Sequence, residues 1–487
     1  MKKLLVLILA ISLLLTACSG TGAASGESEN SGSQENSTSE NANESPVTLK
    51  WVSWEYSTTE QMEFVDEVLA RYKEIKPNIE IEYEYIASDQ YQTWLQTQLL
   101  GGTAPELFLV RHAWGQQYLN DGTVIDLTSY LKETENPYNP GTMWIDTFED
   151  GIIAQVEDLT NNKYASISLS SVICKFVYNK DMFEEVGVQE FPKTYEEFLE
   201  VCQKLQDAGY YPMVQGMKVS EGGGYHWFER LVSDQLVAEL VPPMDMNGTG
   251  LIEVNEMARA IDKGEIDLTQ SPWKDAFPII KDMTKYWYPG YTTLQNTDAW
   301  DLFTVGEAAM TFTSIGTHIK SFYEDESRTF EFGIAEFPTI GKETTEYATG
   351  QTFEIGGAPQ GCFCIPVTAS KEQEEAAVDF LKFMSSKEIQ QLMLDSIWGV
   401  ISVKGVEPES ELLQGVTFKN QISPLKLFET YFDKEFWDNS VMQGQLYLLD
   451  QLSLEDYMAG LQQDLVEAKD NYVSTMGWSD ENNWGEQ

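Results

Sequence analysis

Two periodicities alternate along this chain, and their alternation restricts the fold more than any other sequence feature. In residues 79–85, Ile and Tyr alternate with Glu, which is the pattern of a half-exposed strand. In residues 60–76, apolar residues recur at three- and four-residue spacing, which indicates an amphipathic helix, and Pro77 ends it. Strands that alternate with helices predict an α/β fold with a parallel sheet.

The same alternation continues through most of the chain. Thr194 and Glu197 have the spacing of a capping box at the start of one helix, and Gly101-Gly102 and Gly209 mark the ends of two. We expect further strands at 49–54, 106–110, 171–179, 309–313, 332–335 and 362–366, and further helices at 90–100, 194–208, 273–286, 298–307, 371–384 and 387–396. A segment of about 440 residues is too long for one hydrophobic core, so we predict two α/β lobes.

The amino-terminal residues have the features of an export signal. Lys2 and Lys3 precede an apolar run at residues 4–15, which is too short to span a bilayer. The run ends in Leu-Thr-Ala-Cys at residues 15–18, which resembles a bacterial lipobox. We therefore predict a lipoprotein signal peptide at residues 1–18 with lipid attachment at Cys18; the alternative is an ordinary cleaved signal in which this cysteine is incidental.

Residues 19–46 have the composition of a disordered tether. They are rich in Ser, Gly, Glu and Asn and contain no aromatic residue. No second apolar run of bilayer length follows. We expect an extracytoplasmic body that is held at the cell membrane by its lipidated N-terminal cysteine.

Charge and residue usage exclude several classes of function. The chain has 78 acidic and 31 basic residues and a net charge of −47, which argues against nucleic acid as a partner and against a basic membrane-docking face. Its three histidines are scattered, and we find no zinc-binding pattern, nucleophile elbow or phosphate loop. We expect no metal, no cofactor and no catalytic residues, and mostly buried thiols at Cys174, Cys202, Cys362 and Cys364.

A series of short motifs resembles a known family. The segments are Tyr91–Leu99 with Gly102–Leu107, then Val177–Phe183, Pro192–Phe198, Phe303–Met310 and Val378–Ser385. In this order, from about residue 47 to about 470, they resemble the extracellular solute-binding proteins of carbohydrate ABC importers, of the maltose-binding type. The resemblance implies a two-lobed periplasmic-binding-protein-like (type II) fold with a hinge and an interlobe cleft.

The resemblance also implies a domain division and partners. We place lobe 1 at residues 47–166 and 355–400, and lobe 2 at residues 167–354 and 401–487. The expected ligand is a small molecule, an oligosaccharide, and the expected partners are ABC permease subunits in the membrane. The protein is expected to be a monomer and a binding protein rather than an enzyme.

Candidate ligand contacts in lobe 1 follow expected strands. Trp54 and Glu55 come after the strand at 49–54, and Arg111 to Trp114 come after the strand at 106–110. Ligands of open α/β sheets bind at the carboxyl ends of the strands, so these residues are expected in the cleft. The alternative for Trp54 is a core or rim position, and for Arg111 a surface ion pair. Ser170 is a further candidate.

Candidate contacts in lobe 2 are carried over by position from the family. They are Trp227, Trp300, Asp301, Ser314 and Trp437, and for Trp437 a core position is the alternative. Many members have a tryptophan shortly after the segment that corresponds to residues 306–310, but residues 313–316 read Thr-Ser-Ile-Gly. This difference leaves the identity of the ligand open.

Two other functions use the same features. A sensor subunit that presents ligand to a membrane kinase would have the same cleft. A secreted glycoside hydrolase would need two carboxyl groups roughly 5 to 9 Å apart across a cleft.

Overall fold

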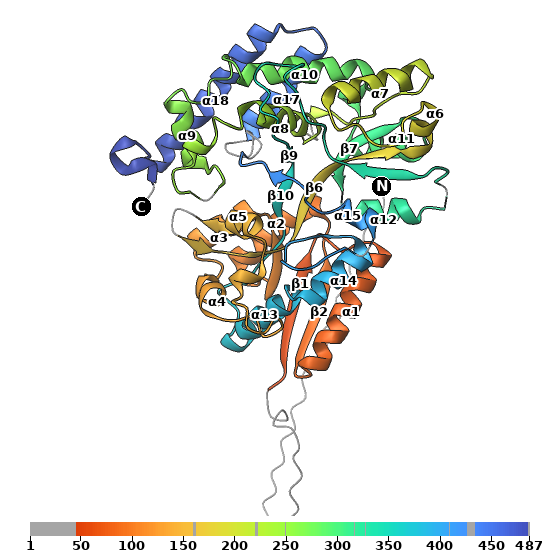
Figure 1. The fold of residues 1–487 in the computed structure, drawn as a ribbon. Helices are drawn as coiled ribbons and strands as arrows, with labels where there is room; N and C mark the ends of the chain where they lie inside the picture. The colour runs from red at the N-terminus through yellow and green to blue at the C-terminus, as the bar shows by residue number, and fades with distance from the viewer. Residues whose placement is uncertain are drawn as a thin grey trace, which may run out of the picture. The chain divides into compact units, whose positions relative to one another are not determined.

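A computed structural model describes residues 45–158, 162–219, 223–248, 250–315, 317–326, 328–408, 410–425 and 434–485. Its centre is a sheet of eight strands in the order β11-β6-β10-β3-β1-β2, with β7 and β8 also paired to β6 (Figure 1). The strands are β1 (Val47–Ser53), β2 (Ile79–Tyr85), β3 (Leu107–Val110), β6 (Ile167–Asn179), β7 (Met310–Ile315), β8 (Phe332–Ala335), β10 (Gly356–Cys364) and β11 (Val400–Ile401).

One part of the sheet is parallel, as the strand and helix alternation predicts. Strand β1 pairs in parallel with β2 and with β3. Helices α1 (Thr59–Ile75) and α2 (Ser88–Gly101) make the two connections. Thr58 caps α1 in a capping box with Gln61, and Gly102, with φ +66°, ends α2 in the left-handed conformation that glycine adopts easily.

The expectation of a parallel sheet is wrong for the other part. Strand β6 is antiparallel to β7, β8, β10 and β11, and β10 is also antiparallel to β3. For β7, the antiparallel direction follows from the long connection after β6. It returns the chain to the end at which β6 finishes, where Met310 pairs with Tyr178, so β7 must run back along β6.

Most helices match their predicted positions. The capping box of Thr194 and Glu197 is present at α7 (Tyr195–Asp207), α13 (Lys371–Met384) has the predicted bounds, and α14 is Lys387–Ile397. The segment predicted as one helix at 273–286 is α10 (Ala276–Met283) with a short 3₁₀ turn on each side. The remaining α-helices used below are α3 (His112–Asn120), α5 (Asp150–Val156), α8 (Gly223–Val237), α11 (Asn296–Thr304), α12 (Thr317–Glu324) and α17 (Lys434–Leu448).

The buried apolar residues of the described ranges form two large cores, a smaller third one and a small cluster around Trp478. The first core draws on residues 49–169 and 362–403, and the second on residues 174–355 and 425–468. The third core lies on the other face of β6 from the second: Phe176 belongs to the second core, whereas Ile173 and Val177 belong to the third. The lobe boundaries given above stay a prediction.

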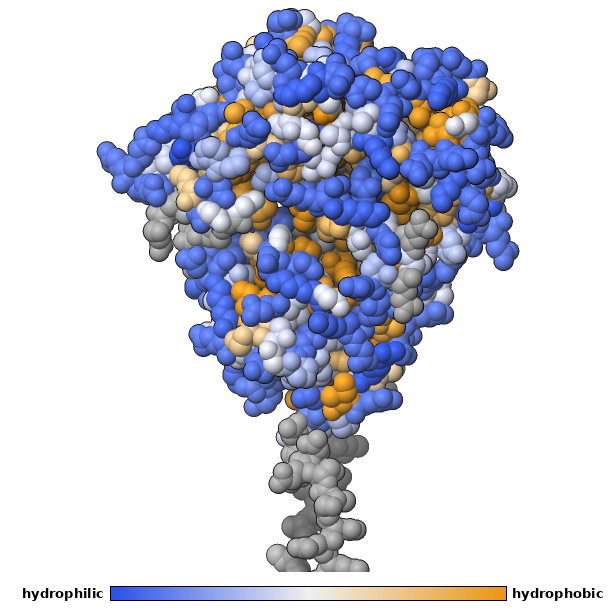
Figure 2. Space-filling view, in the orientation of Figure 1, coloured by the Kyte–Doolittle hydropathy of each residue, from blue (hydrophilic) through white to orange (hydrophobic). Residues whose placement is uncertain are grey.

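The surface and the cysteines agree with the composition. Figure 2 shows hydrophilic residues over most of the face in view, with apolar residues near its centre. Cys174, Cys202, Cys362 and Cys364 are buried free thiols, as expected. Over the described ranges, we find no helix of sufficient length and hydropathy to cross a membrane.

Candidate functional site

Two tryptophans meet at one edge of the parallel part of the sheet. Trp54 follows β1, and Trp114 lies in α3, which follows β3. Because β1 and β3 are parallel neighbours, their carboxyl ends lie at the same edge, and the two indole rings are 5.8 Å apart and edge to face. Tyr91 of α2 packs against Trp54 at 4.7 Å, and its hydroxyl donates to Val52 O at 3.1 Å. We call Trp54, Tyr91 and Trp114 the aromatic cluster.

Arg111 joins this cluster from the start of α3. It is the N-cap residue, but its side chain does not cap the helix. Its guanidinium carbon lies 5.6 Å from the centre of the Trp114 ring, within the range of a cation–π contact. Arg111 is exposed, and its guanidinium carries N–H donors that suit a polar ligand.

Glu55 follows Trp54 directly in the chain and is half-buried. Tyr83 donates its hydroxyl proton to Glu55 O, and the backbone N–H of Gly361 on β10 donates to the Glu55 carboxylate. Burial raises the pKa of Glu55 to about 7, against the opposing effect of the Gly361 hydrogen bond. Near neutral pH this side chain can therefore accept or donate a hydrogen bond.

Ser170 adjoins the same glycine from β6. It pairs with Gln360 of β10 on one side and with Ile401 of β11 on the other. Gly361 has φ +56°, and a Cβ atom there would lie 2.9 Å from Ser170 Oγ, so a larger residue would collide with this serine. Glu55 and Ser170 thus meet at Gly361 and form a polar margin beside the aromatic cluster.

Trp227 and Ser314 lie on the same side of the sheet, further along β6. Trp227 of α8 is half-buried and lies 6.3 Å from Phe312, edge to face. Phe312 and Ser314 are two residues apart in β7 and face the same side of the sheet. Ser314 pairs with Cys174, four residues from Ser170, a separation of roughly 13 Å along the strand.

Trp300 and Asp301 lie on the opposite face. Trp300 of α11 packs on Phe322 at 5.2 Å and on Phe303 at 6.0 Å, both members of the third core. Trp227 packs on the second core. The structure therefore does not bring Trp300 next to Trp227 and Ser314, while Asp301 is exposed.

Two candidates have no described side-chain environment. Trp437 belongs to α17, but the placement of its side chain lies outside what the structure describes. Cys18 is outside the described residues altogether.

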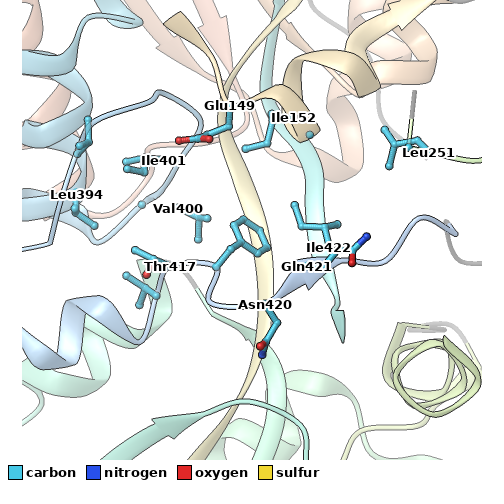
Figure 3. Close-up of a pocket in the computed structure, with 16 residues that line it drawn as sticks. Glu149, Ile152, Leu251, Leu394, Val400, Ile401, Thr417, Asn420, Gln421 and Ile422 are labelled. Carbon is cyan, nitrogen blue, oxygen red and sulfur yellow. The ribbon is translucent and has the colours of Figure 1, made fainter. Parts of the chain in front are cut away.

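Sequence patterns carried little signal for three features of the structure. Tyr91 begins a family-like segment, but nothing in the pattern assigned it to a site. Gly361 becomes notable only through its two neighbours, Glu55 and Ser170. The third feature is a pocket of about 470 Å³ beside β11, drawn in Figure 3, which none of the predicted site residues lines.

Over the described residues, no three His, Cys, Asp or Glu side chains gather in the arrangement of a metal site. The arrangement around Trp54 instead brings two half-buried indole rings, the Arg111 guanidinium and the Glu55 carboxyl group to one sheet edge. Groups of these kinds can orient a small polar ligand.

Comparison with known proteins gives the family. A family model described as bacterial extracellular solute-binding protein matches residues 56–391. This chain belongs to that family. The match covers more than half of the sequence and confirms the resemblance inferred from the short motifs.

Individual members are distant in sequence. The putative ABC transporter periplasmic-binding protein YcjN of Escherichia coli (strain K12) is 23% identical over 167 residues, which are 34% of this chain and 36% of that protein. The alignment thus spans only about a third of this relative.

Solved structures match over a longer range. A chitin oligosaccharide binding protein superposes with a TM-score of 0.64 at 20% identity, covering 87% of this chain and 99% of its own. RafE from Streptococcus pneumoniae has a TM-score of 0.64 at 18% identity, covering 88% and 99%. The two-lobed α/β fold expected from the sequence is therefore confirmed.

Proposed function

We propose that this solute-binding protein takes a sugar or oligosaccharide between its two lobes and delivers it to the permease of an ABC importer. The observation that carries the proposal is the meeting of Trp54, Trp114 and Arg111 at the carboxyl ends of two parallel strands. This edge of an open α/β sheet is where ligands bind in such folds.

The chemistry of the cluster suits a carbohydrate. The apolar face of a sugar ring can stack on an indole, while its hydroxyl groups bond to planar polar side chains. Arg111 supplies hydrogen-bond donors. Glu55 can either accept or donate a hydrogen bond, because burial raises its pKa to about 7. Arg111 lies over the Trp114 ring, and Glu55 follows Trp54 directly in the chain.

Relatives support this ligand class. One of the matching structures is named for chitin oligosaccharide, and a second structure of RafE holds raffinose. We extend carbohydrate binding from these proteins to the present chain. The proposed contacts are Trp54, Glu55, Arg111, Trp114 and Ser170 in lobe 1, and Trp227, Ser314 and Trp437 in lobe 2; Trp300 and Asp301 are left out of this set because they lie on the opposite face of β6.

The proposal includes export and anchoring. The signal-like residues 1–18, which end in the lipobox cysteine Cys18, support a lipoprotein on the outer side of the cell membrane. We further propose that it acts as a monomer. A lipid-tethered binding protein remains close to the permease that it supplies.

A thermal-shift screen against an oligosaccharide panel tests the proposed ligand class. A ligand that binds only the folded protein raises the melting temperature, and we expect at least one oligosaccharide to do so. Trp54→Ala and Trp114→Ala should reduce the shift. Trp478→Phe is the matched control, because Trp478 packs on Tyr472 and Trp484 in a separate small cluster. Mass spectrometry of the recovered ligand distinguishes binding from hydrolysis.

If no sugar raises the melting temperature, or if the Trp54 and Trp114 variants respond as the control does, the proposed site is wrong. Recovery of shortened oligosaccharides would favour an enzyme instead.

A further inference from the structure

The sequence of residues 245–256 has a spacing of oxygen-bearing side chains that the proposed sugar site does not use. It reads Asp-Met-Asn-Gly-Thr-Gly-Leu-Ile-Glu-Val-Asn-Glu. Acidic or amide residues stand at its first, third, ninth and twelfth positions, and glycine stands at the sixth. This is the spacing of an EF-hand calcium loop, whose sixth residue is glycine and whose twelfth is a bidentate glutamate. The departure from the usual pattern is threonine at the fifth position, Thr249, which lies outside the described residues.

The first half of the loop curls back on Asp245. Asp245 Oδ1 accepts a hydrogen bond from Gly248 N at 2.8 Å, and Oδ2 accepts one from Gly250 N, also at 2.8 Å. Gly250 has φ +82°, so the sixth position has a backbone conformation that glycine adopts easily. The backbone of the fourth and sixth positions is therefore held against the carboxylate of the first.

The second half of the loop leads into a helix. Helix α9 (Val254–Asp262), labelled in Figure 1, begins at the tenth position. Glu253, at the ninth, is its N-cap residue and forms a capping box with Glu256. Ile252, at the eighth, is buried in the second core, and its N–H donates to Pro424 O at 2.9 Å. The eighth residue thus ties the loop to a distant part of the chain.

Glu256, at the twelfth position, turns its carboxylate back toward the start of the loop. Its side chain is buried, and Oε1 accepts hydrogen bonds from Met246 N at 2.5 Å and Asn247 N at 3.2 Å. Its Oε2 accepts one from Glu253 N at 2.8 Å. The last residue of the loop therefore lies against the second and third, the residues that follow Asp245.

The two carboxylates at the ends of the loop repel each other. Burial raises the pKa of Glu256 to about 7; hydrogen bonds from the backbone oppose the rise, and the charge of Asp245 adds to it. A cation held between the two side chains would offset both the burial and the repulsion.

Calcium suits this arrangement of donors. It takes about six to eight oxygen ligands, which include amide oxygens, backbone carbonyls and water as well as carboxylates. A calcium loop therefore does not need three acidic, histidine or cysteine side chains at one point. The sequence-based expectation of no metal rested on zinc patterns, which do not cover such a site.

We propose that Asp245, Asn247, Leu251 and Glu256 form a calcium site. Asp245, the amide of Asn247 and Glu256 supply side-chain oxygens, the carbonyl of Leu251 at the seventh position supplies a backbone oxygen, and water completes the coordination. The ion joins the first position of the loop to the twelfth. It thereby stabilises the start of α9, which is a structural role separate from sugar binding.

Equilibrium dialysis with radioactive calcium tests the site on purified protein that has been stripped with EDTA. We expect one saturable site with a Kd of about 10⁻⁵ to 10⁻³ M, the range of the weaker calcium loops, and magnesium should compete at least about tenfold less well. Calcium should also raise the melting temperature of the stripped protein, because the ion binds the folded state.

Two variants remove single ligands. Asp245→Asn and Asn247→Ala should each weaken calcium binding about tenfold or more, equivalent to about 1.4 kcal/mol. Asn247 is exposed, so Asn247→Ala decides the matter if Asp245→Asn does not fold. Asp262→Asn is the matched control, because Asp262 is an exposed acid of the same helix outside the loop. It should bind calcium as the wild-type protein does.

The rival explanation is unspecific attraction, since a net charge of −47 draws divalent cations to the surface as a whole. Uptake without saturation, equal competition by magnesium, or equal affinity in folded Asn247→Ala and Asp262→Asn would overturn the calcium site. Trp54→Ala should leave calcium binding unchanged, and its effect on sugar binding tests the sugar proposal alone. Loss of calcium binding in Trp54→Ala would also overturn the site proposed here.

Discussion

Replacing Lys175 with methionine would remove the cation of a buried ion pair while keeping a side chain of similar length. Lys175 Nζ lies 2.8 Å from Glu354 Oε2 and 3.1 Å from Glu336 Oε1. The lysine side chain is 0% exposed and that of Glu354 only 2%. Loss of one partner from such a pair costs about 3 to 5 kcal/mol, because the other charge stays buried without compensation.

Two features of this network place the expected cost at the lower end of that range. Glu354 Oε1 keeps its two backbone donors, Lys419 N and Asn420 N, and Glu336 is 28% exposed to water. We therefore expect Lys175→Met to lower the free energy of unfolding by about 3 kcal/mol. Urea unfolding at neutral pH, followed by both circular dichroism and tryptophan fluorescence, measures this difference.

Lys419→Met is the matched control. Lys419 Nζ also pairs with Glu336, at 3.5 Å, but its side chain is 47% exposed, so its loss should cost less than about 1 kcal/mol. The double variant Lys175→Met/Glu354→Gln should recover part of the loss, since glutamine still accepts the amide protons of Lys419 and Asn420. If Lys175→Met costs no more than Lys419→Met, the buried pair does not stabilise the fold as argued.

Four further predictions concern the site and the membrane. Burial raises the pKa of Glu55 from 4.5 to about 7, so the stability that its protonated form contributes is complete below pH about 4.5 and is lost as pH rises through about 7. The melting temperature of Glu55→Gln should therefore exceed that of the wild-type protein by an amount that grows over this pH range. Melting-temperature curves that stay parallel would contradict this. Trp54→Ala should weaken sugar binding by about 1 to 3 kcal/mol in calorimetry, and equal affinity in a folded variant would assign Trp54 to the rim of the core. Cys18→Ala should release the protein from membranes in a fractionation experiment, and retention after a high-salt wash would refute the lipid anchor. Saturating sugar should reduce the radius of gyration in small-angle scattering if the ligand favours a closed form, and an unchanged radius at saturation would exclude closure.

Local patterns determined the elements of the chain. The alternation of Ile and Tyr with Glu gave β2, and the Thr194 and Glu197 spacing gave the start of α7. Each depends on neighbours within a few residues, so no knowledge of the rest of the molecule is needed. The positions of Trp54 and Arg111 after their strands were likewise readable, because a parallel arrangement places both strand ends at one edge.

Strand partners and sheet faces were decided only by tertiary structure. Ser170 pairs with Gln360, 190 positions away, and a strand's sequence does not encode the direction of so distant a neighbour. Trp227 and Trp300 lie on opposite faces of the sheet because their helices cover different cores, and the sequence of either helix alone does not determine which core it covers. The approach of Glu55 and of Ser170 to Gly361, and the pocket beside β11, arise for the same reason: distant segments meet there, and only their packing fixes the distances between them.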